Sequence, residues 1–164
     1  MQQTENSRKD TATATATATA ARQDWMSVLA KAPADDVIGA WEALADKPRY
    51  RLLRAPETGL VMVQARAGGS GGKFNFGEMT VTRCVVELGK GGTGHAYVAG
   101  SDTEHAEIAA AFDALLQHEG SRGPIVENVI EPLRAAQAER RRVTEAKSAA
   151  TRVDFFTLVR GDSE

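Results

Sequence analysis

The sequence predicts an α+β fold, in which an N-terminal helical pair and C-terminal helices pack on an antiparallel meander sheet, with a late C-terminal strand. Two observations predict this class. Apolar residues recur at helical spacing before Tyr50 and again after Ser101, whereas the runs between them have the length and composition of strands. The links between these runs are too short for crossover helices, so the strands are expected to be antiparallel.

The length and charge of the chain restrict its function class. Its 164 residues fit one domain, and its formal net charge is only −2. This charge and the lack of an aromatic and basic platform disfavour a nucleic-acid partner. A membrane partner is not expected either, because no apolar run approaches the about 18 residues of a spanning helix. The first residues resemble neither a secretory signal nor a transit peptide.

The first 21 residues differ in composition from the rest. Residues 11–20 read TATATATATA and follow the polar stretch MQQTENSRKD. No bulky apolar side chain is present there to offset the backbone entropy lost on ordering. We therefore expect residues 1–21 to be a disordered leader and residues 22–164 to form a single domain. The strict alternation leaves a weak strand as the alternative.

A pair of helices is expected to open the domain. Pro33 separates two segments in which apolar side chains recur every three or four residues. Asp35 or Asp36 is expected to cap the second helix, because a carboxylate there accepts otherwise unpaired backbone N–H groups. The apolar faces comprise Trp25, Val28 and Leu29 in the first helix and Val37, Trp41 and Leu44 in the second.

Four strand-like runs predict the meander, at residues 49–55, 59–66, 77–88 and 93–100. Pro56 and Gly59 bracket the first link, as a turn requires. Gly89, Gly91 and Gly94 formally match G-x-G-x-x-G, but this match lies between two strands rather than between a strand and a helix. It therefore predicts a hairpin turn and no dinucleotide site.

Cys84 is the single cysteine of the chain. An intrachain disulfide and a cysteine metal cluster are thereby excluded, and a reducing cytoplasm is the expected location. Because Cys84 alternates with Thr82 and Val86 in a strand-like run, we expect a small buried residue rather than a reactive thiol.

Helices resume at the capping box formed by Ser101 and Glu104. Gly120 and Gly123 are expected to end this helix, whose apolar stripe comprises Ile108, Phe112, Leu115 and Leu116.

A second C-terminal helix is expected from about Pro124 and should be kinked or split by Pro132, which cannot donate a helical hydrogen bond. This helix should continue through Arg140–Arg142, a solvated basic face. The run VDFFTLV, residues 153–159, predicts the late strand.

The glycine-rich stretch at residues 67–77 is the first candidate site. Its glycines allow successive backbone N–H groups to converge on an anion, and Lys73 adds positive charge. It does not match a P-loop, because Ala67 and Phe74 occupy positions that need Gly and Ser or Thr. An anion-binding loop and a flexible connection between strands therefore both remain open.

His105 and Glu107 are the candidate catalytic residues, because both groups can transfer protons. His105 shares a helix face with Ile108, and a partly buried histidine with one hydrogen bond is the simpler interpretation. Glu107 lies on another face, so the two do not form an obvious pair. The histidines at positions 95, 105 and 118 show no metal-ligand spacing, and no metal is expected.

Arg66, Arg83 and Arg160 are candidates for binding phosphate, because the planar guanidinium suits such anions. Arg66 and Arg83 lie on adjacent runs of the predicted meander and could meet there. The alternatives are that these arginines face solvent or pair with a carboxylate such as Glu57 or Asp154.

Five strings, in this order, carry a resemblance to the PhnG family: RQDWMSVLAKA, APETGLVMVQARAGGSG, FNFGEMTVTRCVVEL, GHAYVAGSDTEHAE and VDFFTLVRGD. They cover nearly all of residues 22–162, whereas the Thr-Ala leader lies outside the pattern. The resemblance implies a subunit rather than a self-contained enzyme, in the carbon–phosphorus lyase pathway of phosphonate use. The isolated chain is expected to be inactive.

The resemblance also implies partners and a reaction. With PhnH, PhnI and PhnL, members of this family are required to make α-D-ribose 1-methylphosphonate 5-triphosphate from ATP and methylphosphonate, with release of adenine. They belong to a core complex with PhnH, PhnI and PhnJ, in which PhnI is credited with the nucleosidase chemistry. No cofactor of the chain's own is implied, and ATP is a substrate of the complex.

Two hypotheses follow from this resemblance. In the first, the chain is a structural and activating subunit that docks PhnI through apolar side chains, with Trp25, Met26, Phe155 and Phe156 as candidates. In the second, the chain contributes anion-binding groups to a shared active site. The family motifs then supply Arg66, Gly68, Gly69, Gly71, Lys73, Arg83 and Arg160 as candidates, with His105 in a third motif.

Overall fold

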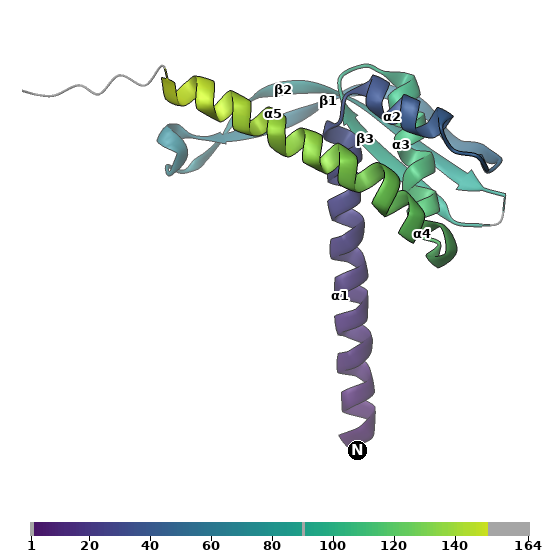
Figure 1. The fold of residues 1–164 in the computed structure, drawn as a ribbon. Coiled ribbons are helices and arrows are strands. Elements are labelled where there is room, and N and C mark those ends of the chain that lie inside the picture. The colour runs from purple at the N-terminus through teal and green to yellow at the C-terminus, as the bar shows by residue number, and fades with distance from the viewer. Residues whose placement is uncertain (1, 90, 151–164) are drawn as a thin grey trace, which may run out of the picture.

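The structure is a computed structural model that describes residues 2–89 and 91–150 (Figure 1). Helices pack on a three-stranded antiparallel sheet with the strand order β1-β2-β3, which confirms the predicted α+β class. One face of β2 and β3 is covered by the helices, since alternate residues from Thr82 to Leu88 and from Gly94 to Val98 are buried.

The helix α1 (Gln2–Lys31) includes the Thr-Ala repeat, so the disordered leader that the sequence predicts is helical over its described part. Figure 1 shows its N-terminal portion projecting away from the body of the protein. Alanine is the strongest helix former, and residues 2–31 contain neither glycine nor proline. The packed turns after Arg22 supply the nucleus, from which the helix extends at little further cost.

The helix α2 (Ala34–Glu42) completes the predicted helical pair. Pro33 occupies the N-cap position and makes no side-chain cap, so the prediction of an Asp35 or Asp36 cap is wrong. Both aspartates lie in the first turn, where their charge is favourable at the positive end of the helix dipole. The predicted apolar faces are confirmed, since Trp25, Val28, Leu29, Val37 and Trp41 are buried and Leu44 is partly buried.

The strand β1 (Tyr50–Arg66) is continuous, which corrects the prediction of two strands joined by a turn. The register shifts between Leu52 and Glu57 mark irregularities in pairing rather than a reversal of the chain. Pro56 is tolerated because β1 is an edge strand, where a missing N–H group interrupts fewer ladder bonds.

The strands β2 (Lys73–Leu88) and β3 (Thr93–Ala99) follow, with the 3-10 turn η1 (Ala67–Gly69) between β1 and β2. The turn between β2 and β3 contains Gly91 and Gly92 at φ 86° and 100°, as the predicted hairpin requires. Gly94 permits close packing of β3 on the next helix, because a Cβ atom there would clash with Ala110 and Ala114.

The helix α3 (Thr103–Leu116) forms the centre of the core, and its predicted apolar stripe is confirmed. Asp102 rather than Ser101 caps it, accepting a hydrogen bond of 2.9 Å from the backbone N of His105. Phe112 is fully buried and makes an edge contact with Trp41 at a ring-centroid distance of 5.3 Å.

The remaining helices are α4 (Glu119–Ile125), the π-helical turn η2 (Val126–Ile130) and α5 (Glu131–Ala150). Gly120 and Gly123 lie within α4 and do not end a helix, contrary to the prediction. The predicted split at Pro132 is confirmed, because the π-helical turn η2 ends at Ile130 and α5 begins at Glu131. The wider π-helical turn makes room where the proline ring would crowd the preceding turn of an α-helix. The predicted strand at 153–159 lies outside the described residues.

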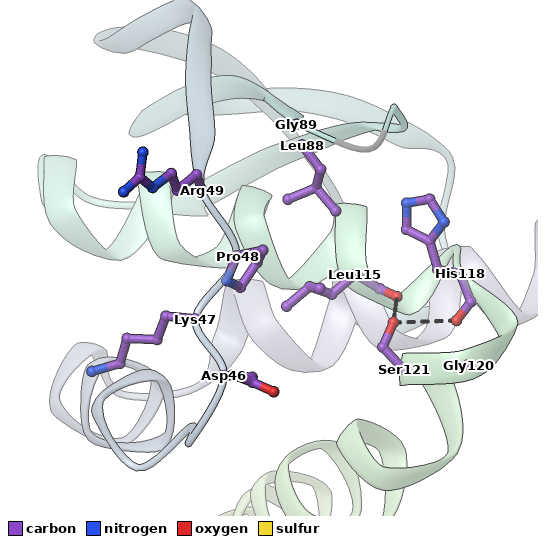
Figure 2. A pocket seen from close by; sticks show the side chains of 10 residues that line it. All are labelled: Asp46, Lys47, Pro48, Arg49, Leu88, Gly89, Leu115, His118, Gly120 and Ser121. Carbon is purple, nitrogen blue, oxygen red and sulfur yellow. Dashed lines mark hydrogen bonds between the residues drawn. The ribbon is translucent and has the colours of Figure 1, made fainter.

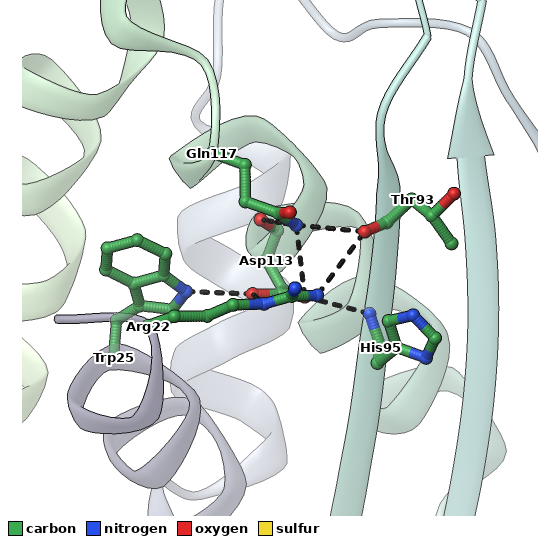
Figure 3. A network of polar contacts seen from close by, with 6 residues as sticks. All are labelled: Arg22, Trp25, Thr93, His95, Asp113 and Gln117. Carbon is green, nitrogen blue, oxygen red and sulfur yellow. Dashed lines mark hydrogen bonds and ion pairs between the residues drawn. The ribbon is translucent and has the colours of Figure 1, made fainter. Parts of the chain in front are cut away.

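The carboxylate of Asp113 joins α1, α3 and β3 in one buried polar network (Figure 3). Its Oδ1 accepts from Nε1 of Trp25 at 2.9 Å and from Nε of Arg22 at 3.1 Å. Its Oδ2 accepts from Nη2 of Arg22 at 2.7 Å and from the backbone N of His95 at 2.9 Å. Gln117 Nε2 closes the network by donating to the carbonyl of Thr93 at 2.9 Å. The charge is fully removed from water but is well solvated by these donors.

Replacing the carboxylate of Asp113 with an amide should destabilise the fold. In Asp113→Asn, one acceptor becomes a donor that faces other donors, and Arg22 loses its counter-ion. We expect the free energy of unfolding to fall by about 3 kcal/mol, measured by urea unfolding followed by tryptophan fluorescence. Arg141→Gln breaks the exposed pair with Glu145 and is the control, with an expected change below about 0.5 kcal/mol. Equal stability of Asp113→Asn and the native chain would contradict this role.

The thiol of Cys84 should be unreactive in the folded protein. The residue is buried in β2, as predicted, and burial, followed by the charge of Glu107, raises the pKa of its thiol from 9.0 to about 11. Alkylation by iodoacetamide at pH 8 should therefore be at least about 100-fold slower in the native chain than in urea. Because the unfolded thiol ionises first, stability should also fall as the pH rises from 9.0 toward 11. Equal alkylation rates in the native and unfolded states would contradict the burial of this residue.

Candidate functional site

The candidate site residues that the structure describes lie in three separate places: the end of the β1–β2 hairpin, the sheet beside β3, and the core under α3. The hairpin end is formed by Arg66 and Lys73, which pair directly across the two strands. Arg66 Nη1 donates to the carbonyl of Gly71 at 2.9 Å, and Gly68 takes φ 59°. The predicted loop at 67–77 is thus a shorter turn, because β2 already begins at Lys73.

Arg83 lies far from this turn and pairs with a carboxylate, as one of the alternatives predicts. Its Nη2 atom lies 3.0 Å from Oε2 of Glu57, and hydrogen bonds to Tyr97 and Glu57 raise the pKa of Arg83. In the ladder, Arg83 lies opposite Glu57. Glu57 and Arg66 are nine residues apart on β1, and nine residues of strand span about 30 Å. The hypothesis that Arg66 and Arg83 meet is therefore wrong for this chain.

His105 connects α3 to the end of α1. Its side chain is buried, and its Nε2 lies 2.9 Å from the carbonyl oxygen of Leu29. This arrangement matches the simpler interpretation of a packed histidine with one hydrogen bond. Because the ring is buried and its Nε2 is engaged with the backbone, the structure uses this histidine in packing.

Glu107 serves a different contact on the same helix. It accepts a hydrogen bond of 2.8 Å from the hydroxyl of Tyr50, which ties the start of β1 to α3. Burial, together with this bond and the charge of Glu107, raises the pKa of Tyr50 well above its ordinary value. His105 and Glu107 therefore face separate neighbours, as expected, and do not form a catalytic pair.

An open pocket of about 670 Å³ lies where the loop before β1 meets the start of α4 (Figure 2). Two of its polar side chains are engaged with the backbone. His118 Nε2 lies 2.9 Å from the carbonyl oxygen of Gly91, and Ser121 Oγ donates to the carbonyl oxygen of Leu115 at 2.6 Å. Figure 2 shows Lys47 and Arg49 extending away from these two residues. The hydroxyl of Ser121 thus donates to backbone carbonyls rather than to a side-chain base.

Neither this pocket nor the Asp113 network was predicted from the sequence. The pocket combines segments 46–49, 88–89 and 115–121, which share no motif. A carboxylate within the otherwise apolar run around Phe112 was the available signal for Asp113.

The residues predicted to dock a partner differ in how far they are buried. Trp25 is buried with its indole N–H on Asp113, so its prediction as an exposed anchor is wrong. Met26 is partly buried and lines a groove between α1 and β3. Phe155, Phe156 and Arg160 lie outside the described residues.

Among residues 2–89 and 91–150, no group of three or more histidine, cysteine or acidic side chains is arranged to hold a metal ion. None of the helices in this part of the chain has the length and apolar character needed to cross a membrane.

Known proteins are similar in sequence to most of the chain. The sequence profile of the family described as "Phosphonate metabolism protein PhnG" matches residues 20–161. A protein of Rhizobium meliloti (strain 1021) is 47% identical over 144 residues, which cover 87% of this chain and 91% of that protein. That relative is named "Alpha-D-ribose 1-methylphosphonate 5-triphosphate synthase subunit PhnG". The chain therefore belongs to the PhnG family of phosphonate metabolism proteins.

Proposed function

We propose that this chain is a subunit of an α-D-ribose 1-methylphosphonate 5-triphosphate synthase. Together with PhnH, PhnI and PhnL, it is required for transfer of the ribose triphosphate moiety of ATP to methylphosphonate, with release of adenine. The name and high coverage of the Rhizobium relative support this assignment. The complex works in the cytoplasm, the core contains PhnJ as well, and the chain holds no cofactor of its own.

Within the complex, the role of the chain is structural and activating toward PhnI. This proposal rests on one observation, namely that the candidate site residues lie apart from one another in the structure. His105 and Glu107 are used in packing, Arg83 is paired with Glu57, and Arg66 lies about 30 Å of strand away from Arg83. A chain arranged in this way does not assemble a reaction centre from its described residues, and the isolated chain is inactive.

A second candidate role is supported by the cations at the hairpin end. Arg66 and Lys73 lie side by side there, and neither forms an ion pair with a carboxylate among the described residues. Such groups can offset the charge of a triphosphate or a phosphonate if a partner's active site lies beside them. In this role the chain contributes anion-binding groups to a shared site.

Omitting the chain should abolish the reaction. We expect PhnH, PhnI and PhnL together with this chain to release adenine from ATP and methylphosphonate, and the same mixture without the chain to release none above background. Adenine is measured by chromatography. A mixture that lacks ATP is the control for free adenine. Unchanged release without the chain would contradict the requirement for it.

The two candidate roles differ in what the hairpin cations do. In the double variant Arg66→Gln and Lys73→Gln, a structural role predicts adenine release per assembled complex within about twofold of the native value. Direct contact with the substrates predicts a loss of about 100-fold or more, because charge-assisted contacts that stabilise a transition state contribute several kcal/mol. Lys47→Gln, a cation away from the hairpin, is the matched control.

A further inference from the structure

Exposed apolar side chains gather on one part of the sheet. The ladder between β2 and β3 ends at Val81 and Ala99, and beyond it residues 60–80 continue as a two-stranded ribbon, which we call the arm. Figure 1 shows this ribbon reaching past the rest of the sheet. Among the described residues, five of the nine exposed large apolar side chains lie on the arm: Leu60, Met62, Phe74, Phe76 and Met79.

Both faces of the arm carry these side chains. Paired residues of an antiparallel ladder project to the same face, and successive residues alternate. Leu60 and Met62 therefore lie on one face. Met79, opposite Val61, and Phe74, opposite Ala65, lie on the other. Phe76 is the unpaired bulge residue, and its ring makes an edge contact with Phe74 at 6.2 Å between centroids.

No described element of the chain covers the arm. All residues of β2 from Lys73 to Thr80 are exposed, whereas alternate residues from Thr82 onward are buried. Phe76 is 72% exposed and Leu60 is 63% exposed, values far from those of core side chains. A two-stranded ribbon is marginally stable by itself in water, and apolar patches of this kind mark interaction surfaces.

The positive charge of the arm lies at its end. Arg66 and Lys73 are adjacent there, and Glu78, the acidic residue of the arm, pairs across from Met62, four residues along β1 from Arg66. One N–H group of Arg66 donates to Gly71. The other donors of its guanidinium have no partner among the described residues. A surface that receives this end must therefore supply negative charge.

The size of the arm restricts the shape of that surface. Seven residues of strand span about 23 Å and two strands about 10 Å, so one face offers about 230 Å². A stable specific interface buries about 800 Å² on each partner. A second copy stacked on one face would bury too little and would leave the opposite face exposed. Enclosure of both faces more than doubles the area that the arm contributes to an interface.

We propose that the arm inserts into a cleft of another synthase subunit, with apolar walls against both faces and carboxylates at the inner end. This inference rests on the proposed function, because it takes the partner to be a subunit of that complex. Insertion removes Leu60, Met62, Phe74 and Met79 from water together and pairs Arg66 and Lys73 with opposite charge.

The test compares variants of each face in the full complex. The chain is co-expressed with the other subunits named above, PhnI carries the affinity tag, and the amount of chain that co-purifies is measured. We expect the pair Leu60→Ser and Met62→Ser, and separately the pair Phe74→Ser and Met79→Ser, each to lower recovery about tenfold or more. Val143→Ser, which changes an exposed apolar residue on α5, should leave recovery unchanged.

The charge at the end of the arm is tested in the same assay. Arg66→Glu with Lys73→Glu should lower recovery about tenfold, whereas Lys47→Glu should not. Urea unfolding of each isolated variant verifies folding, and unchanged midpoints are expected because the altered side chains are exposed.

Several outcomes would overturn the proposal. Full recovery of both face variants would contradict insertion while leaving the proposed function intact. Sensitivity of one face alone would contradict the enclosing cleft. Self-association of the isolated chain that the face variants abolish, with assembly unaffected, would assign the arm to a second copy. Failure of the native chain itself to co-purify would contradict the proposed function.

Discussion

The packing of this domain depends on one buried charge, the carboxylate of Asp113. A carboxylate inside an apolar helix is costly unless donors surround it, and here the donors come from α1, from β3 and from Gln117 at the C-cap of α3. Arg22 and Trp25 place the last turns of α1, and the N–H group of His95 places β3. His105 adds a second link between α3 and α1 through the carbonyl of Leu29. The polar groups of the core therefore determine how the helices sit on the sheet, and they are not available for chemistry.

The parts of the fold that depend on local patterns could be predicted from the sequence. The apolar spacing around Trp25 and Phe112 identified two packed helices, and the glycines between residues 89 and 94 identified a hairpin. The predictions failed where tertiary context decides. Pro56 appeared to end a strand, but an edge strand tolerates it. The Thr-Ala repeat appeared unable to order, but it continues a helix that packing begins elsewhere.

The candidate site shows the same limit. Residue types indicated which groups can bind anions or move protons, but not which of them come together. Arg66 and Arg83 lie on paired strands and are nevertheless distant, because the register places Glu57 opposite Arg83. His105 belongs to a motif of the family and is buried in a structural contact. The resemblance identified the family, whereas the geometry shows how the described residues are used. The candidate polar residues lie apart from one another, and the apolar arm is exposed. Both features are typical of a protein that functions as a subunit of a complex.

If residues 60–80 are the surface through which this chain joins its partner subunits, hydrogen–deuterium exchange should show it, because this measurement reports on the unmodified chain in the free state and in the assembled complex. We expect amide exchange in peptides covering 60–66 and 73–80 to slow strongly on assembly, since both edges of the ribbon become enclosed. Peptides from α5 near Val143 should change little. Exchange in the arm that is equally fast before and after assembly, with protection confined to other elements, would contradict the claim.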